Sequence, residues 1–202
     1  MQKTFPLLAV AATLDTSMNV VTQQRRENNW QPTGEHLDNL HEREPNSRKR
    51  IRLTFPGALR LGTALRLNEA GILGRETFQL SRAPAEVGNS PASWGDGPHE
   101  ANPWDTRAPG KIFAAGRTWL VVDPRRRDDL TGLPVHRVIC TADPAFKATE
   151  LILTAPDEGK VEGDPETVII VDLSALGHRL CAGLKVDPAE FLITPAPESG
   201  WS

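Results

Sequence analysis

The sequence predicts an all-β fold, an antiparallel sandwich or barrel with long irregular arms and at most one or two short helices. Three observations favour this class. Apolar and polar residues alternate over several short segments, which is the period of a half-buried strand. The chain has 17 prolines and 16 glycines among 202 residues, a frequency that disfavours long helices. The length fits a single β domain spanning residues 1–202.

The first half of the chain is predicted to form a meander of short strands. Residues 1–15 are interpreted as a first strand. In residues 50–55, apolar side chains alternate with arginines, and in residues 58–68 four leucines share one strand face. A Pro-Gly pair between these two segments predicts a turn. A further short strand is expected at residues 76–80.

The second half repeats this pattern. Residues 168–171 read Val-Ile-Ile-Val, a continuous apolar run typical of a strand buried on both faces. A glycine between two apolar segments indicates a hairpin over residues 111–122. Helix is expected only at residues 35–44 and as one turn at residues 173–178. The strands predicted in this half are residues 111–115, 117–122, 134–141, 149–154, 167–172, 179–186 and 191–194.

Two segments are predicted to be irregular arms. Residues 22–50, and the Pro/Gly-rich residues 81–111, contain three large apolar side chains each, too few for a core of their own. We expect these segments to gain their burial against neighbouring subunits. Tryptophans beside proline and glycine resemble anchors that fill a partner's pocket. The tryptophans interpreted as partner contacts are Trp30, Trp94, Trp104 and Trp201.

Charged residues suggest self-association, with nucleic acid as the alternative partner. Residues 1–82 carry 12 basic and 8 acidic side chains, whereas residues 143–202 carry 4 and 11. The predicted strands would place four arginines on one sheet face, where they repel unless carboxylates or phosphates face them. Aromatic residues between them, which would favour nucleic acid, are missing from these strands. These arginines are Arg50, Arg52, Arg60 and Arg66, with Arg60 and Arg66 the preferred partner contacts.

No catalytic, cofactor or metal motif is evident. His136 with Cys140, and His178 with Cys181, lack the close paired spacing of a zinc site. We expect both thiols to be buried and structural, and the protein not to be an enzyme. A Cys–His hydrolase, with Cys140 paired to His178 or Cys181 paired to His136, is a residual alternative. It is only residual because the sequence contains no nucleophile elbow and no flanking glycine signature.

Membrane association is not expected. No apolar run approaches the roughly 18–20 residues that a membrane helix needs. The short apolar stretch near the N-terminus is preceded by Pro6, and no signal peptide is expected. The net charge of −3 is too small to imply a nucleic-acid or membrane partner by itself.

One segment carries a resemblance. Residues 112–121, with the sequence Ile-Phe-Ala-Ala-Gly-Arg-Thr-Trp-Leu-Val, resemble the hairpin common in small β-barrel proteins of tailed-phage virions, of the head-closure, tail-completion or decoration type. The resemblance implies a non-enzymatic structural assembly subunit, located in the virion. Its partners would be copies of itself and other virion structural proteins.

Overall fold

The computed structural model describes residues 3–27, 41–43, 51–72, 74–86, 107, 110–113, 117–141 and 168–193. About half of these residues are helical, so the predicted all-β class is wrong. The helices are α1 Leu7–Thr13, α2 Met18–Glu27, α3 Phe55–Glu69, α4 Arg75–Leu80, α5 Arg82–Glu86, α7 Leu173–Leu184 and α8 Pro188–Phe191. The strands are β1 Thr4–Pro6, β2 His41–Arg43, β3 Ile51–Thr54, β4 Ile112–Phe113, β5 Arg117–Arg127, β6 Pro134–Thr141, β7 Ile169–Asp172 and β8 Leu192–Ile193.

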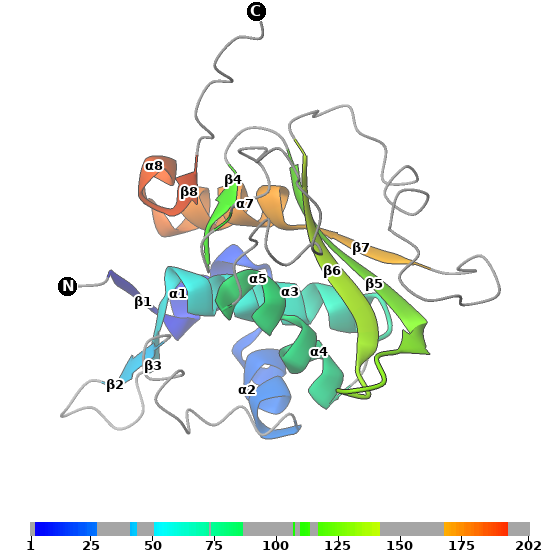
Figure 1. Cartoon of the computed structure of the whole chain (residues 1–202). Coiled ribbons are helices and arrows are strands. Elements are labelled where there is room, and N and C mark those ends of the chain that lie inside the picture. Colours follow the sequence, from blue (N-terminus) through cyan, green and yellow to red (C-terminus); the bar gives the residue numbers. More distant parts are fainter. Residues whose placement is uncertain are drawn as a thin grey trace, which may run out of the picture.

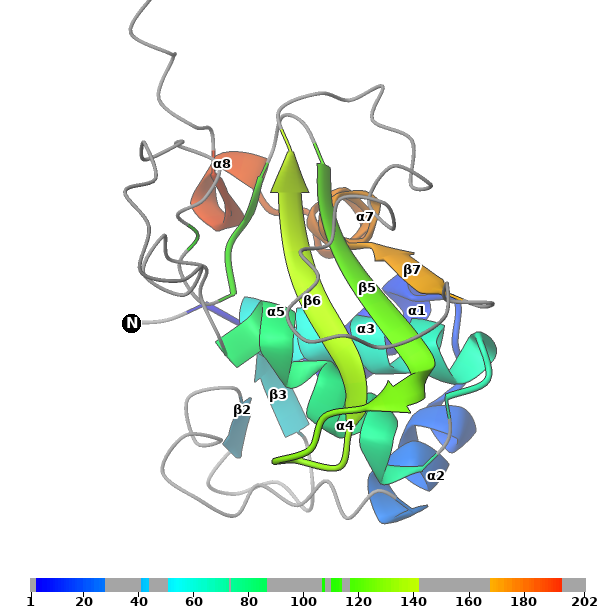
Figure 2. The ribbon, with the colours of Figure 1, turned by 45° about the vertical axis from the view of Figure 1, so that its right-hand side comes forward.

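Helix α3 runs through the middle of the molecule, with α7 on one side and α2 and α4 on the other (Figure 1). A three-stranded antiparallel sheet of order β6-β5-β7 lies against these helices (Figure 2). A second antiparallel sheet, of order β1-β3-β2, brings the start of the chain beside the strand that precedes α3. Strands β4 and β8 form a short parallel pair.

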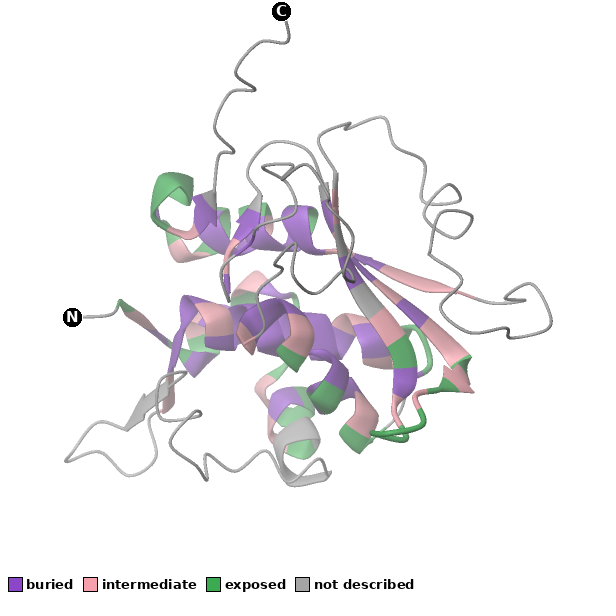
Figure 3. Cartoon of the chain, viewed as in Figure 1, coloured by how far each residue is buried: buried purple, intermediate pink, exposed green. Residues whose placement is uncertain are grey.

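The segment over residues 58–68, predicted as a strand, belongs to α3. Thr54 caps this helix, because its Oγ1 accepts a hydrogen bond from the Gly57 N–H at 3.3 Å. Pro56, predicted to lie in a turn, stands instead in the first helical turn, where a missing N–H costs nothing. The helix is buried almost all round (Figure 3). Leucines on several faces of a helix blur its 3.6-residue period, which explains the mistaken strand.

The strand predicted at residues 179–186 is also wrong, because α7 continues through it. The helix begins at Asp172, whose carboxylate accepts a hydrogen bond from the Ala175 N–H at 2.8 Å. Leu173, Leu176 and Leu180 are buried at helical spacing. The helical turn predicted at residues 173–178 is therefore the first part of a longer helix. The strands predicted at residues 1–15 and 76–80 are likewise mostly helix, in α1 and α4.

Several predicted strands are confirmed. Strands β3, β5, β6 and β7 fall within or overlap the segments expected at residues 50–55, 117–122, 134–141 and 167–172. Strands β4 and β8 are shorter than predicted. They pair with each other, so β4 and β5 do not form the predicted hairpin. The strand expected at residues 149–154 lies outside the described residues.

The two ends of the described chain meet in one aromatic cluster. The Phe191 ring stacks on Phe55 with centroids 4.4 Å apart, and meets Phe5 edge-on at 6.2 Å. Lys3 and Glu190 add an exposed ion pair at 3.2 Å. The N- and C-terminal elements therefore share a single core.

Glycines let α7 approach its neighbours closely. A Cβ atom on Gly183 would lie 2.4 Å from Thr13 Cγ2 in α1, and one on Gly177 would lie 2.2 Å from Ile112 Cδ1 in β4. In α3, a Cβ on Gly62 would lie 2.9 Å from a methyl carbon of Leu176. The packing of α7 against α1, α3 and β4 thus requires the absence of side chains at these positions.

The Gly183→Leu substitution should destabilise the protein. The new Cβ meets Thr13, a β-branched residue whose Oγ1 already donates a hydrogen bond to the Ala9 carbonyl at 2.9 Å. We expect a loss of about 1–3 kcal/mol, measured by urea denaturation. The control is Ala182→Leu at the adjacent exposed position, expected to change stability by less than about 0.5 kcal/mol. Equal stability of the two variants would contradict the packing described.

Candidate nucleic-acid interface

Helices α1 and α2 are joined by a tight four-residue turn, residues 14–17. The Thr16 N–H donates to the Ala11 carbonyl at 3.0 Å and the Asp15 N–H to the Ala12 carbonyl at 3.2 Å. These two bonds, with Asp15 at a φ of 51°, form a Schellman cap. The cap ends α1 sharply and redirects the chain into the next helix.

Ser17 opens α2. Its Oγ accepts a hydrogen bond from the Val20 N–H at 3.3 Å, and its carbonyl accepts one from the Val21 N–H at 3.1 Å. Val21 is completely buried, whereas Asn19, Val20 and Gln23 are exposed. The first two turns of α2 are therefore anchored by Val21, with the partly buried Met18 also packed against the core, and they leave Asn19, Val20 and Gln23 on the surface.

The exposed start of α2 presents two amide side chains and one aliphatic side chain. Asn19 and Gln23 are four residues apart, which places them on one side of the helix. Arg25 and Arg26 occupy the last turn of α2; their side chains lie outside the described residues. Helices α1 and α2 with the short turn between them are called the helix-turn-helix below, in the general sense of two helices joined by a short turn.

A small sheet flanks this pair of helices. Strand β3 is its centre, with Phe5 of β1 opposite Leu53 on one side and His41 of β2 opposite Leu53 on the other. The Arg52 guanidinium donates to Thr4, at 3.0 Å to Oγ1 and 2.8 Å to the carbonyl. The sequence between β2 and β3 contains Arg48, Lys49 and Arg50, outside the described residues.

Arg179 of α7 holds the turn between the two helices. Its Nε donates to the Thr13 carbonyl at 2.8 Å, and its guanidinium pairs with the Asp15 carboxylate. The carbonyl belongs to the last residue of α1, where the helix dipole is negative, so a guanidinium stabilises this end. No local sequence pattern indicates this contact, since the partners are 166 residues apart.

The arginines predicted to form one sheet face are not arranged as expected. Arg60 and Arg66 lie on helix α3, and Arg60 is only 6% exposed. Arg60 pairs with Glu86 at 2.5 Å and donates to the Phe78 carbonyl at 3.2 Å. Burial lowers the pKa of Arg60, and the Glu86 carboxylate opposes this shift. Arg60 thus links α3 to α4 and α5 inside the molecule.

Arg66 and Arg52 are engaged separately. Arg66 pairs with Glu69 on the same helix at 2.6 Å, and Arg52 contacts β1. Arg50 lies outside the described residues, as do Trp30, Trp94, Trp104 and Trp201. The partner contacts predicted for these tryptophans stay predictions. The two predicted arms contain regular structure where they are described, in α2, β2 and α5.

The cysteine and histidine candidates do not come together as a metal site. Among the described residues, no group of three or more His, Cys, Asp and Glu side chains is placed to hold a metal ion. Cys140 and Cys181 are both free thiols. Cys181 is 1% exposed, and burial, with a smaller contribution from Asp187 and Glu190, raises its pKa to about 11. The His136 ring Nδ1 lies 2.9 Å from the Pro134 carbonyl oxygen.

The sequence does contain a signal for the helix pair. Leu7, Val10, Ala11 and Leu14 follow the i, i+3, i+4, i+7 spacing of a buried helix face. Ser17 then supplies a cap for a second helix. The interpretation of residues 1–15 as a strand overlooked both.

Known proteins offer no guide to this chain. Comparisons with protein families, curated proteins and solved structures found no match. Within the part of the chain that the structure describes, no helix has the length and apolar character to span a membrane.

Cys181 should resist alkylation in the folded protein. With a pKa of about 11, about one thiol in a thousand is ionised at pH 8, and the reactive species is the thiolate. In the Cys140→Ser variant, which isolates Cys181, we expect labelling by iodoacetamide about a hundredfold slower than in urea. Mass spectrometry measures both rates. Similar rates in the folded and unfolded states would show that Cys181 is accessible.

Proposed function

We propose that this protein binds double-stranded DNA through its helix-turn-helix, with α2 as the recognition helix. The observation that carries the proposal is the turn at residues 14–17, followed by exposed Asn19, Val20 and Gln23 at the start of α2. In helix-turn-helix proteins the N-terminal residues of the second helix contact base edges in the major groove, and the first helix crosses the backbone.

The exposed side chains of α2 fit base recognition. The amides of Asn19 and Gln23 each combine a donor and an acceptor, which matches the N6 and N7 atoms of adenine in the major groove. Val20 is 40% exposed and supplies an apolar contact of the kind that favours the thymine methyl group. The preferred site therefore contains A·T base pairs.

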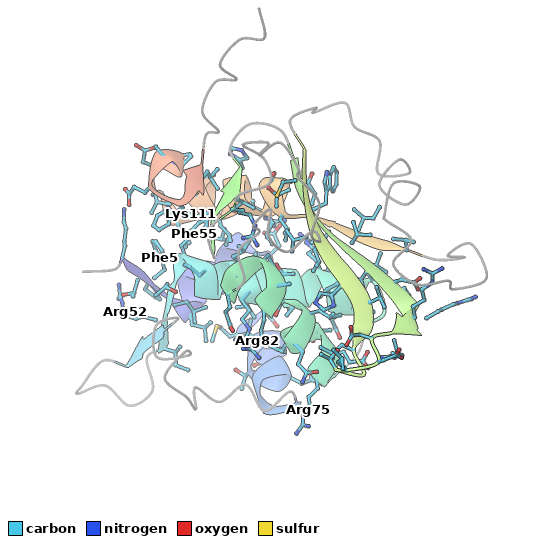
Figure 4. The ribbon with its side chains drawn as sticks, in the orientation of Figure 1. Phe5, Arg52, Phe55, Arg75, Arg82 and Lys111 are labelled. Carbon is cyan, nitrogen blue, oxygen red and sulfur yellow. The ribbon has the colours of Figure 1, made fainter. Side chains whose placement is uncertain are left out.

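Basic residues are available for contacts to the phosphate backbone. Arg25 and Arg26 belong to α2, and the sequence between β2 and β3 contains three further basic residues, outside the described residues. Arg75 begins α4, and its exposed side chain points away from the body of the molecule at the end where α2 lies (Figure 4). Such contacts give affinity and register without reading sequence.

This proposal changes the surface assigned to nucleic acid. The sequence pattern indicated an arginine face of a β-barrel, and that face does not form because Arg60 is buried on a helix. The expectation of a virion structural subunit, with other virion proteins as partners, stays a prediction.

Selection from a pool of random duplexes should recover a specific site. The Asn19→Ala, Gln23→Ala double variant should then bind that site at least about tenfold more weakly, because each bidentate amide contact is worth about 1–3 kcal/mol of discrimination. Fluorescence anisotropy measures the affinity, and circular dichroism checks that the variant is folded.

His178→Ala provides the control for this variant, since His178 is exposed on α7, which lies on the other side of α3 from α2 (Figure 1). It should bind the selected duplex as the wild type does. If no duplex is enriched, or if both variants bind equally well, α2 is not a recognition helix.

Salt dependence should separate phosphate contacts from base contacts. The Arg25→Gln, Arg26→Gln variant should bind all duplexes more weakly and reduce the slope of log K against log salt by about one for each phosphate that is no longer neutralised. The Asn19→Ala, Gln23→Ala variant should leave this slope nearly unchanged. A slope unaffected by removal of both arginines would exclude them from the interface.

A further inference from the structure

A surface hollow lies beside the Arg179 contact. It has a volume of about 300 Å³ and is bounded by α3, β7 and α7. Its apolar wall includes Ile169, Val171 and Leu176, and its charged residues are Arg66, Asp172 and Arg179. The volume suits a small molecule, and the combination of an apolar wall with a few charged groups is typical of ligand sites.

The two arginines of this hollow are held by partners that are easily displaced. Glu69, which pairs with Arg66, is 60% exposed, and Asp15, which pairs with Arg179, is 84% exposed. Exposed ion pairs contribute little, because water solvates the released carboxylate well. The carboxylate of Asp172 caps α7, where it accepts a hydrogen bond from the Ala175 N–H at 2.8 Å. A competing anion can therefore replace Glu69 or Asp15 as the partner of either guanidinium group with only a small loss of free energy.

We propose that this hollow binds a small carboxylate with an apolar body, and that binding there draws Arg179 away from the helix-turn-helix. The carboxylate pairs with Arg179 and Arg66, and the apolar body lies on Ile169, Val171 and Leu176. The proposal deepens the proposed function, on which its regulatory part rests, because the ligand would control DNA binding.

The coupling follows from the two roles of Arg179. The same side chain lines the hollow and pairs with Asp15, the left-handed residue of the turn between α1 and α2. A ligand that takes over the guanidinium leaves the Asp15 carboxylate without this partner and weakens the hold on the Thr13 carbonyl. The turn loosens, and α2 is less well oriented for the major groove. The ligand and DNA then oppose each other's binding by the same factor.

Hexanoate is a suitable probe, with hexan-1-ol as the matched neutral compound. We expect saturable NMR shift changes at residues 169–172 and 179 with hexanoate and much smaller ones with hexanol. Hydrogen exchange of the amides at residues 14–17 should accelerate in the hexanoate complex. At saturation, affinity for the selected duplex should fall by about fivefold, the scale of an exposed ion pair.

Two variants sharpen the experiment. Arg179→Gln should abolish the effect of hexanoate on the turn and on DNA affinity, and should itself weaken DNA binding. Arg127→Gln is the matched control, because Arg127 also forms a partly exposed ion pair, with Glu76 at 2.5 Å, outside the hollow. It should respond to hexanoate as the wild type does.

The outcomes distinguish this inference from the proposed function. If hexanoate does not bind, or binds Arg179→Gln and wild type equally, the inference is overturned while DNA binding is untouched. If hexanoate binds and loosens the turn but no duplex is selected, the ligand site is supported and the proposed function fails. If duplex affinity is unchanged at saturating hexanoate, the proposed coupling is wrong.

Discussion

The close approach of α7 to α1 and α3 is the constraint on which the rest of the structure depends. Gly183 and Gly62 leave room for this contact, and Leu176 fills the space beside Gly62. Arg179 lies on the same helix and reaches the end of α1. Because α7 also supports β5, where the Ser174 hydroxyl accepts the Thr118 N–H at 2.8 Å, one helix positions both the sheet and the helix-turn-helix.

Sequence patterns predicted strands better than helices in this chain. Strands β5, β6 and β7 have β-branched runs between turn residues, and their positions could be predicted. Helix α3 could not be recognised by periodicity, because apolar residues cover most of its surface. The start of α3 could nevertheless be predicted, because Thr54 followed by Pro56 is typical of a helix N-terminus. The high glycine content was misinterpreted as evidence against helices, whereas Gly62, Gly177 and Gly183 allow helices to pack closely.

The candidate site was partly accessible from the sequence. The spacing of Leu7, Val10 and Leu14, with Ser17 after them, is sufficient to predict two joined helices. The roles of the charged residues could not be predicted from such local patterns. The sequence pattern places Arg60 on the surface, because its ion-pair partner Glu86 lies 26 residues away and no local pattern indicates that contact. Likewise, the hydrogen bond between Arg179 and Thr13 joins residues 166 positions apart. Such pairings arise from tertiary packing, which local patterns do not record.

The long separation between α1 and α7 also shapes how the protein is made. The ion pair between Asp15 and Arg179 joins residues 164 apart, and the pair between Lys3 and Glu190 joins residues 187 apart. Contacts between such distant parts of a chain slow folding, because a large loop must close before they form. During translation, the first helices leave the ribosome long before α7 does. The apolar surface of α1 that α7 covers therefore stays exposed until α7 has been synthesised, and exposed apolar surface of this kind makes a nascent chain prone to aggregation.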